Sequence, residues 1–571
     1  MKKLTLQGLF VFRTAPFTFL LHAAIIVSLS MLQACEKPKT ESPAPIQFFD
    51  LNYIKYNGVS TSTLVTNCTA NPTFEINFSR PLDTTNAKTQ IAIKEGGFTP
   101  VPVQYSFKNS DSTLILHCKI PLKYFTKYVL ALPTTLKSKS GATFTKYFSV
   151  LIRTGIDTAN KYNLLSNNTL MDSVQYRTLQ YFWKFAHPVS GLARERNTSG
   201  DLVTSGGSGM GVMAIVAGVN RNFISRIDAV NHLTKMSKFL LYNTKVYHGA
   251  FPHWFNGANG NTIAFSSNDD GADLVETSYL IEGLLTARQY FSYNSAEEIS
   301  LREKIDSIWH RVEWNWFTKN GAETNLYWHW SPTKGFIMNM PIRGWNECLI
   351  THVLAASSPT FPVSANVYKN CWAINGGIKN GKSFYGYKLP LGSDYGGPMF
   401  FAHYSFLGID PRGLSDQYAD YWEQNQNHAK INYSYCKANP KKFAGYSENC
   451  WGLTASDNPW GYDAHSPTND RGVISPTAAL ASMPFTPTES TAAMNFFYYK
   501  MGDKLWKEYG FVDAFHIGET WIANSFLAID QGPIVVMIEN HRTALLWEQF
   551  TSCPELKSGM KKLGFSAPYL N

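Results

Sequence analysis

The sequence predicts an all-α domain preceded by a small β-sandwich. Residues 46–155 hold short β-rich runs separated by turn residues, whereas residues 170–571 hold long apolar-periodic segments with helical spacing. The helical segments do not alternate with strands, and loops rich in Gly, Pro, Asn and Trp separate them. This pattern argues against a βα barrel and favours a toroid of helices.

Residues 1–35 have the features of a bacterial lipoprotein signal peptide. Basic residues precede an apolar stretch, and the sequence Leu-Gln-Ala-Cys that ends at Cys35 resembles a lipobox. We therefore expect cleavage before Cys35, lipidation of its thiol, and a protein anchored to the membrane of the bacterial cell envelope, on the periplasmic face or the outer surface. An ordinary signal peptide with an incidental Cys is the alternative. The Pro-rich residues 36–45 would form a tether.

Residues 46–155 predict the β-sandwich because several runs alternate apolar and polar residues or are rich in β-formers. These runs are 74–78, 91–93, 112–116 and 128–132. The phrases FEINFSRPLD and YVLALPTTLKSKSG resemble a bacterial immunoglobulin-like module, which implies a supporting role. Cys68 and Cys118 fall in this module and could pair in an oxidising envelope. A polar connector follows at residues 156–169.

The composition favours a neutral, ring-shaped ligand. Aromatic residues make up 14% of the chain and charged residues only 16%, which suits stacking against sugar rings. The net charge is +9, but no run of five basic residues occurs, so nucleic acid is a poor partner. The Cys residues lack metal-ligand spacing, so we expect neither a metal nor a cofactor.

The helical domain begins at about Leu170, and its further predicted helices follow from apolar periodicity. They lie at about 209–221, 225–244, 271–293, 297–317, 341–356, 414–437, 475–482, 488–500, 519–530 and 533–547.

Three acids form the main candidate catalytic cluster. Asp269, Asp273 and Glu276 are spaced i, i+4 and i+7, which would place their carboxylates on one face of a helix. Like charges at this spacing repel each other, so a purely structural helix would tend to avoid them. The alternative is that the acids complement the helix dipole and face water. The neighbouring segment HGAFPHWFNG has the aromatic and polar residues that contact sugars.

A second candidate acid is Glu347. Pro341 would start a helix and place Glu347 in its second turn, beside Trp345 and Arg343. An indole disfavours the charged carboxylate and raises its pKa, as a general acid requires, while the Arg opposes that shift. The alternative is an ion pair between Arg343 and Glu347 at a helix start.

Aromatic and polar residues in the loops are candidate substrate contacts, especially between 393 and 470. The candidate substrate-binding residues are His253, Trp254, Arg343, Trp345, Asn346, His403, Tyr404 and Trp451. Asp530 and Glu539 are interpreted instead as structural polar anchors.

The run from about 171 to 547 resembles the bacterial glucoamylase-like domain of glycoside hydrolase family 144. Matching phrases include GSGMGVMAIVAGVNR, DDGADLVETSYLIEGLL, WNE and AIDQGPIVVMIENHRT. The resemblance implies an (α/α)6 barrel and inverting hydrolysis of β-1,2-glucan, by endo or exo action. The family's acidic helix maps onto Asp269, Asp273 and Glu276, and its Asn-Glu acid maps onto Asn346 and Glu347.

In the mechanism that these residues support, Glu347 protonates the leaving oxygen. Asp273 or Asp269 activates a water molecule on the opposite face of the sugar, and Glu276 orients the substrate.

Three rival functions remain open. An α-glucosidic glucoamylase-type hydrolase differs only in linkage, which composition does not distinguish. A polysaccharide lyase could use Arg343 to neutralise a uronate and His403 or Tyr404 as its base, but three clustered acids would repel a uronate. A glycan-binding lipoprotein without turnover would gain little from repelling carboxylates.

Overall fold

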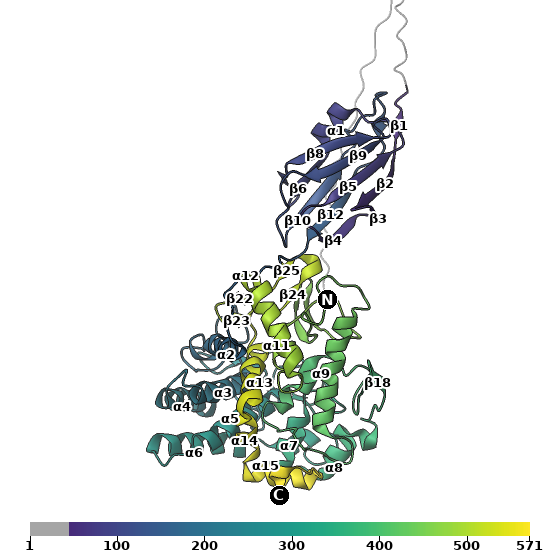
Figure 1. Cartoon of the computed structure of the whole chain (residues 1–571). Coiled ribbons are helices and arrows are strands. Elements are labelled where there is room, and N and C mark those ends of the chain that lie inside the picture. Colours follow the sequence, from purple (N-terminus) through teal and green to yellow (C-terminus); the bar gives the residue numbers. More distant parts are fainter. Residues whose placement is uncertain (1–44) are drawn as a thin grey trace, which may run out of the picture. The chain divides into compact units, whose positions relative to one another are not determined.

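The computed structural model describes residues 45–571 of the chain. Residues 1–44, with the predicted signal peptide and lipidation site Cys35, lie outside the described residues. Strands dominate from Phe48 to Thr154, and helices dominate after Asn167 (Figure 1). Among the described residues, no helix is both long enough and apolar enough to cross a membrane.

The N-terminal part is a β-sandwich of two five-stranded sheets. One sheet has the order β3(Val59–Thr61), β2(Leu51–Tyr56), β5(Thr73–Phe78), β9(Thr113–Cys118), β8(Val103–Lys108). The other has the order β4(Leu64–Cys68), β12(Phe148–Thr154), β10(Lys127–Leu132), β6(Ala92–Glu95), β7(Thr99–Pro100). A short ladder joins β1(Phe48–Phe49) to β11(Thr143–Phe144). Strand β12 pairs with β4 in parallel, while the pairs within the first sheet are antiparallel.

Alternating side chains build the core of the sandwich. Phe74, Ile76 and Phe78 of β5 are buried, while the residues between them are partly exposed. Leu114 and Leu116 of β9 join the same core cluster. The sequence pattern predicted these strands but missed helix α1(Thr84–Gln90). Cys68 and Cys118 are free thiols in this structure.

The rest of the chain forms one large hydrophobic core built mainly from helices. The longer helices are α2(Asn167–Trp183), α3(Ser205–Asn220), α4(Arg226–Tyr242), α5(Leu274–Tyr290), α6(Ala296–His310), α7(Leu349–Ser357), α9(Tyr421–Ala438), α11(Pro487–Asn495), α13(Ala528–Thr543) and α15(Pro554–Leu563). Shorter ones are α8(Ala365–Val367), α10(Pro476–Leu480), α12(Gly502–Leu505) and α14(Leu545–Thr551).

Helix α3 is a central packing element, in contact with α2, α5 and α13. Every residue from Ser205 to Val219 is buried, so this helix is surrounded on all sides. Glycines allow the approach of α3 to α5, because a Cβ on Gly209 would lie 2.0 Å from the carbonyl oxygen of Tyr279. On the facing helix, a Cβ on Gly283 would lie 2.1 Å from the carbonyl oxygen of Gly209.

Several predicted helix boundaries are wrong; the helix expected at 414–437, for example, begins only at Tyr421. Helix α5 begins at Leu274, not at 271, because Asp273 is its N-cap and also forms strand β16(Ala272–Asp273) with β17(His329–Trp330). Only Glu276 of the acidic triplet is therefore helical.

The helix expected from Pro341 begins only at Leu349, because Pro341 is bridged to Tyr327 and Gly344 has a φ of +79°. Glu347 thus lies in the loop before α7. The helix expected at 519–530 is also wrong, since strand β25(Trp521–Ile522) occupies its start. Helix α13 begins at Ala528 and continues past Pro533 to Thr543, so the boundary expected at 533 is wrong as well.

Candidate active site

Asp273 holds the start of α5 and orients the acidic cluster. Its Oδ1 accepts hydrogen bonds from the backbone N–H groups of Val275 and Glu276, at 3.0 and 2.9 Å. This is the hydrogen-bonding pattern of an Asp N-cap. Its Oδ2 lies 3.0 Å from Nδ1 of His253 and 3.8 Å from Nε2 of His329. Both carboxylate oxygens are therefore already engaged.

The pKa values of Asp273 and His253 move in opposite directions. Burial raises the pKa of Asp273, but the hydrogen bond and charge of His253, aided by the backbone, hold it below its ordinary value. Burial lowers the pKa of His253, but Glu276, Asp273 and Asp269 outweigh this and raise it to about 9. The pair is thus an imidazolium and a carboxylate at neutral pH.

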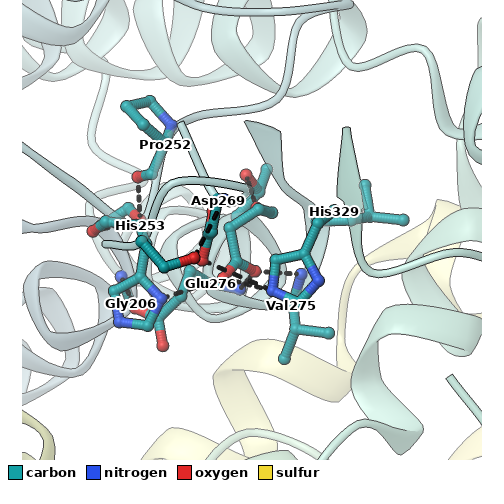
Figure 2. Close-up of polar contacts among 12 residues, drawn as sticks. Gly206, Pro252, His253, Asp269, Val275, Glu276 and His329 are labelled. Carbon is teal, nitrogen blue, oxygen red and sulfur yellow. Dashed lines mark hydrogen bonds and ion pairs between the residues drawn. The ribbon is translucent and has the colours of Figure 1, made fainter. Parts of the chain in front are cut away.

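Asp269 lies in the turn that precedes Asp273, and its side chain is directed toward His329 (Figure 2). Its Oδ2 is 3.5 Å from Nε2 of His329. Burial, followed by the negative charge of Asp273, raises the pKa of Asp269 to about 7. This carboxyl group can exchange a proton near neutral pH.

Glu276 sits at a close contact between α5 and the start of α3. Its Oε2 accepts hydrogen bonds from the backbone N–H of Gly206 at 2.9 Å and the hydroxyl of Thr204 at 3.2 Å (Figure 2). A Cβ on Gly206 would lie only 2.5 Å from this oxygen, so the contact requires glycine. Burial raises the pKa of Glu276.

Glu347 faces the acidic cluster from a different segment. The hydroxyls of Ser405 and Tyr279 donate to its backbone carbonyl and fix the loop, while no side chain of the described residues donates to its carboxyl group. Burial, with smaller contributions from the charges of Glu276 and Asp273, raises the pKa of Glu347 to about 7. A half-buried carboxylic acid that holds its proton near pH 7 suits general acid catalysis.

A second group of carboxyls, formed by Asp457, Asp513 and Asp530, was not predicted as a cluster. The backbone N–H of Asp457 donates to Oδ2 of Asp513 at 2.7 Å, and Nη1 of Arg196 lies 3.2 Å from Oδ2 of Asp457. Burial raises the pKa of Asp513 to about 7 and that of Asp530 well above its ordinary value. Among the described residues, Asp513 Oδ1 and Asp530 Oδ2 have no hydrogen-bond partner, and a hydrogen bond to Asp513 contributes to the raised pKa of Asp530.

Tyr404 lies within electrostatic reach of both sets of carboxyls. Burial raises the pKa of Tyr404, and the charges of Asp530, Glu347 and Glu276 raise it further. Asp530 was interpreted as a structural anchor, and no local sequence signal marks it as functional, because its burial follows from tertiary packing around the start of α13.

Aromatic side chains adjoin the acidic cluster. Phe265 is 50% exposed and stacks on His253 with ring centroids 4.4 Å apart. It also contacts Trp254 at 4.6 Å. The three rings form a platform of the kind that packs against sugar rings. Phe265 was missed because it follows the predicted aromatic run by several residues.

Several predicted substrate contacts lie elsewhere. His403 is buried with Nε2 3.0 Å from Oγ of Ser482, and burial lowers its pKa to about 3. Trp451 is fully buried, with its indole N–H donating to the carbonyl of Glu489. These two side chains are core residues in this structure.

The three remaining predictions lie around Glu347. Trp345 is buried against Phe406 and Tyr421, and Oδ1 of Asn346 accepts the backbone N–H of Cys348. Arg343 is exposed and has no ion-pair partner among the described residues, so the expected pair with Glu347 does not form.

One atom each from His253, Asp269 and Asp273 lies within 4.8 Å of the others, a spacing that a metal ion could use. In this structure His253 and Asp273 form an ion pair at this place, with Nδ1 3.0 Å from Oδ2.

The site combines three features: a carboxylic acid that keeps its proton near pH 7, further carboxyl groups near it, and a platform of aromatic rings. This combination is typical of glycoside hydrolases. The Glycoamylase family model, for glucoamylases, matches residues 339–554, and the bacterial Ig-like domain model matches residues 57–151. A crystal structure of a candidate glucoamylase from Bacteroides uniformis is 53% identical, with 72% of this chain and 100% of that chain covered and a TM-score of 0.71. The chain belongs to this glucoamylase-like family, glycoside hydrolase family 144.

Two other relatives have stated activities. The endo-β-1,2-glucanase of Chitinophaga pinensis, solved with sophorotriose and glucose, is 49% identical, with 71% of this chain and 100% of that chain covered and a TM-score of 0.69. An exo β-1,2-glucooligosaccharide sophorohydrolase of Parabacteroides distasonis is 44% identical over 421 residues. That match covers 70% of this chain and 58% of the length of the curated relative.

Proposed function

We propose that this protein hydrolyses β-1,2-glucan with inversion at the anomeric carbon. The observation that carries the proposal is Glu347, a half-buried carboxyl with a pKa of about 7 that lies near Glu276 and the ionised Asp273. The relatives with stated activities act on β-1,2-linked glucans, which supports this linkage over the α-glucosidic one.

In the proposed reaction, Glu347 donates its proton to the leaving glycosidic oxygen. A carboxylate on the other face of the sugar removes a proton from water as the water attacks the anomeric carbon, and the acid and base lie roughly 6.5–9.5 Å apart in such enzymes. Asp273 is a poor base because both its oxygens are engaged, so we assign it to orienting His253 and the start of α5. Glu276 is assigned to orienting the substrate.

Asp269 and Asp530 are then the two candidates for the base. Asp269 lies beside His253 of the aromatic platform, and Asp530 belongs to the second group of carboxyls, whose charge acts on Tyr404 as that of Glu347 does. Azide distinguishes them, because a small anion can replace a deleted base carboxylate. We expect Asp269→Ala to regain activity with azide, while Asp530→Ala does not; the reverse pattern would assign the base to Asp530.

We propose further that the helices form an (α/α)6 barrel around this site. The family resemblance and the packing of α3 on α5 and of α4 on α6 support the arrangement. A crystal structure in which the helices do not close into two concentric rings would contradict it.

The substrate class is tested with a panel of glucans. We expect reducing ends to appear from linear β-1,2-glucan and not from starch or laminarin. Mixed oligosaccharides would indicate endo action, and a single short product would indicate exo action. Cleavage of starch alone would favour the glucoamylase rival. A product that absorbs in the ultraviolet would favour the lyase, and binding without new reducing ends would favour the glycan-binding lipoprotein.

We also propose that Cys35 anchors the protein to a membrane of the bacterial envelope. The lipobox-like sequence supports this proposal. Metabolic labelling with a fatty-acid analogue should label the protein, and Cys35→Ser should remove the label. Equal labelling of the two forms would contradict the anchor.

A further inference from the structure

A cavity of about 590 Å³ lies on the surface of the helical domain, apart from the acidic site. One wall is the outer face of α2, where Tyr176, Gln180 and Lys184 are spaced four residues apart and therefore line up along the helix. The opposite wall carries Tyr498 and Trp506. The volume falls in the range of roughly 300–1,000 Å³ that is typical of sites for small ligands.

The aromatic wall is held rigidly. Trp506 begins a hairpin of β22(Trp506–Lys507) and β23(Gly510–Phe511) that presses on α2, because a Cβ on Gly510 would lie 2.7 Å from Oγ1 of Thr178. The Trp506 ring contacts those of Tyr498 and Phe511 edge-on, at 5.3 and 4.9 Å. Tyr509, also in the cavity wall, packs against Tyr181 at 5.5 Å. The aromatic faces are thus fixed before any ligand arrives.

Among the described residues, two basic groups of the cavity have no ion-pair partner, whereas the side-chain amide of Gln180 already donates to the carbonyl of Tyr176. Arg177 and Lys184 are exposed and have no ion-pair partner in the part of the chain that the structure describes. Glu508 adds a carboxylate acceptor to the same wall. Aromatic faces together with both donors and acceptors suit a polyol, and because Arg177 and Lys184 outnumber the Glu508 carboxylate, the test below includes an acidic polysaccharide.

We propose that this cavity is a second carbohydrate-binding site, which holds a segment of the glucan chain away from the catalytic centre. The proposal rests on the proposed glucan hydrolase function. A long glucan chain that is bound in this cavity stays close to the catalytic site, so its binding there becomes intramolecular. The second site therefore strengthens the binding of long chains but not of chains too short to reach both sites.

The test compares a β-1,2-glucan polymer with a short β-1,2-glucooligosaccharide. We expect Tyr176→Ala/Trp506→Ala to raise KM for the polymer about three- to tenfold, and to leave kcat/KM for the short substrate unchanged. A second double variant, Arg177→Ala/Lys184→Ala, alters only exposed side chains and leaves the packing around Trp506 intact. It should also raise KM for the polymer. The matched control is Tyr242→Ala, at a 76% exposed tyrosine on α4 outside the cavity.

A direct measurement uses affinity electrophoresis in gels containing the polymer, with every protein carrying Glu347→Gln. Retardation should weaken with either cavity variant and not with Tyr242→Ala. An unchanged polymer KM and unchanged retardation would overturn the second site while leaving the hydrolase function intact. Retardation by polygalacturonate in place of β-1,2-glucan would overturn the neutral ligand. If the wild type cleaves no β-1,2-glucan, the proposed function itself fails.

Discussion

At the residue scale, proton positions explain how one site can hold several carboxyl groups. Asp273 stays ionised because His253 and the backbone stabilise its charge, whereas for Glu347 burial outweighs its one backbone hydrogen bond and the carboxyl keeps its proton to about pH 7. The difference in environment assigns different roles to chemically similar groups.

The pH dependence of the reaction follows from Glu347. A general acid must be protonated, and a pKa of about 7 keeps Glu347 protonated only below that pH. We therefore expect kcat/KM to fall about tenfold per pH unit above pH 7. A rate profile from pH 5 to 9 on β-1,2-glucan measures this, and a flat profile from pH 7 to 9 would exclude Glu347 as the acid.

The charge of His253 should stabilise the fold in a pH-dependent way. Its pKa is about 9 when folded, against an ordinary value of about 6.5 for histidine. The stabilisation is therefore complete below about pH 6.5 and is lost as pH rises through about 9. His253→Gln, which keeps a polar group without charge, should lower the free energy of unfolding by about 2 kcal/mol at pH 6.

Thermal unfolding of both forms at pH 6 and 9.5 measures this effect. The Tm difference between wild type and His253→Gln should shrink at the higher pH. A difference that grows with pH would show that the imidazolium is not stabilised by the carboxylates.

At the element scale, the site depends on how closely α3 and α5 approach. Gly206 and Gly209 place α3 against α5, which carries Glu276. The acidic triplet was predictable from its spacing, but its helical placement was not, because the pairing of Asp273 with His329 joins distant segments. The same limit applies to Asp457, Asp513 and Asp530, which only tertiary packing brings together.

Gly209→Ala should separate these helices. The new methyl group would meet the carbonyl oxygen of Tyr279 at 2.0 Å, and overpacking of this kind costs about 1–3 kcal/mol or more. We expect the Tm to fall by roughly 2–10 °C and the activity to drop with it. Asn231→Ala, on the exposed face of α4, is the control, and an unchanged Tm for Gly209→Ala would contradict the close packing.

At the scale of the whole molecule, composition predicted that aromatic groups would gather at candidate ligand sites, but not the residues that form those sites. The aromatic excess indicated a sugar ligand, and aromatic groups occur both beside the acidic cluster and in the second cavity. The β-sandwich was predictable because alternation within each strand is a local signal. The burial of His403 and Trp451 was not, because loop residues give no periodic pattern from which burial can be inferred.

The central claim is that Glu347 is the acid of a β-1,2-glucan hydrolase. The most direct measurement is the release of reducing ends from linear β-1,2-glucan by wild type and by Glu347→Gln, with equal Tm values as the control for folding. We predict oligosaccharide products from the wild type and a rate lower by about 10²–10⁴-fold in the variant. Comparable rates in the two proteins would contradict the account.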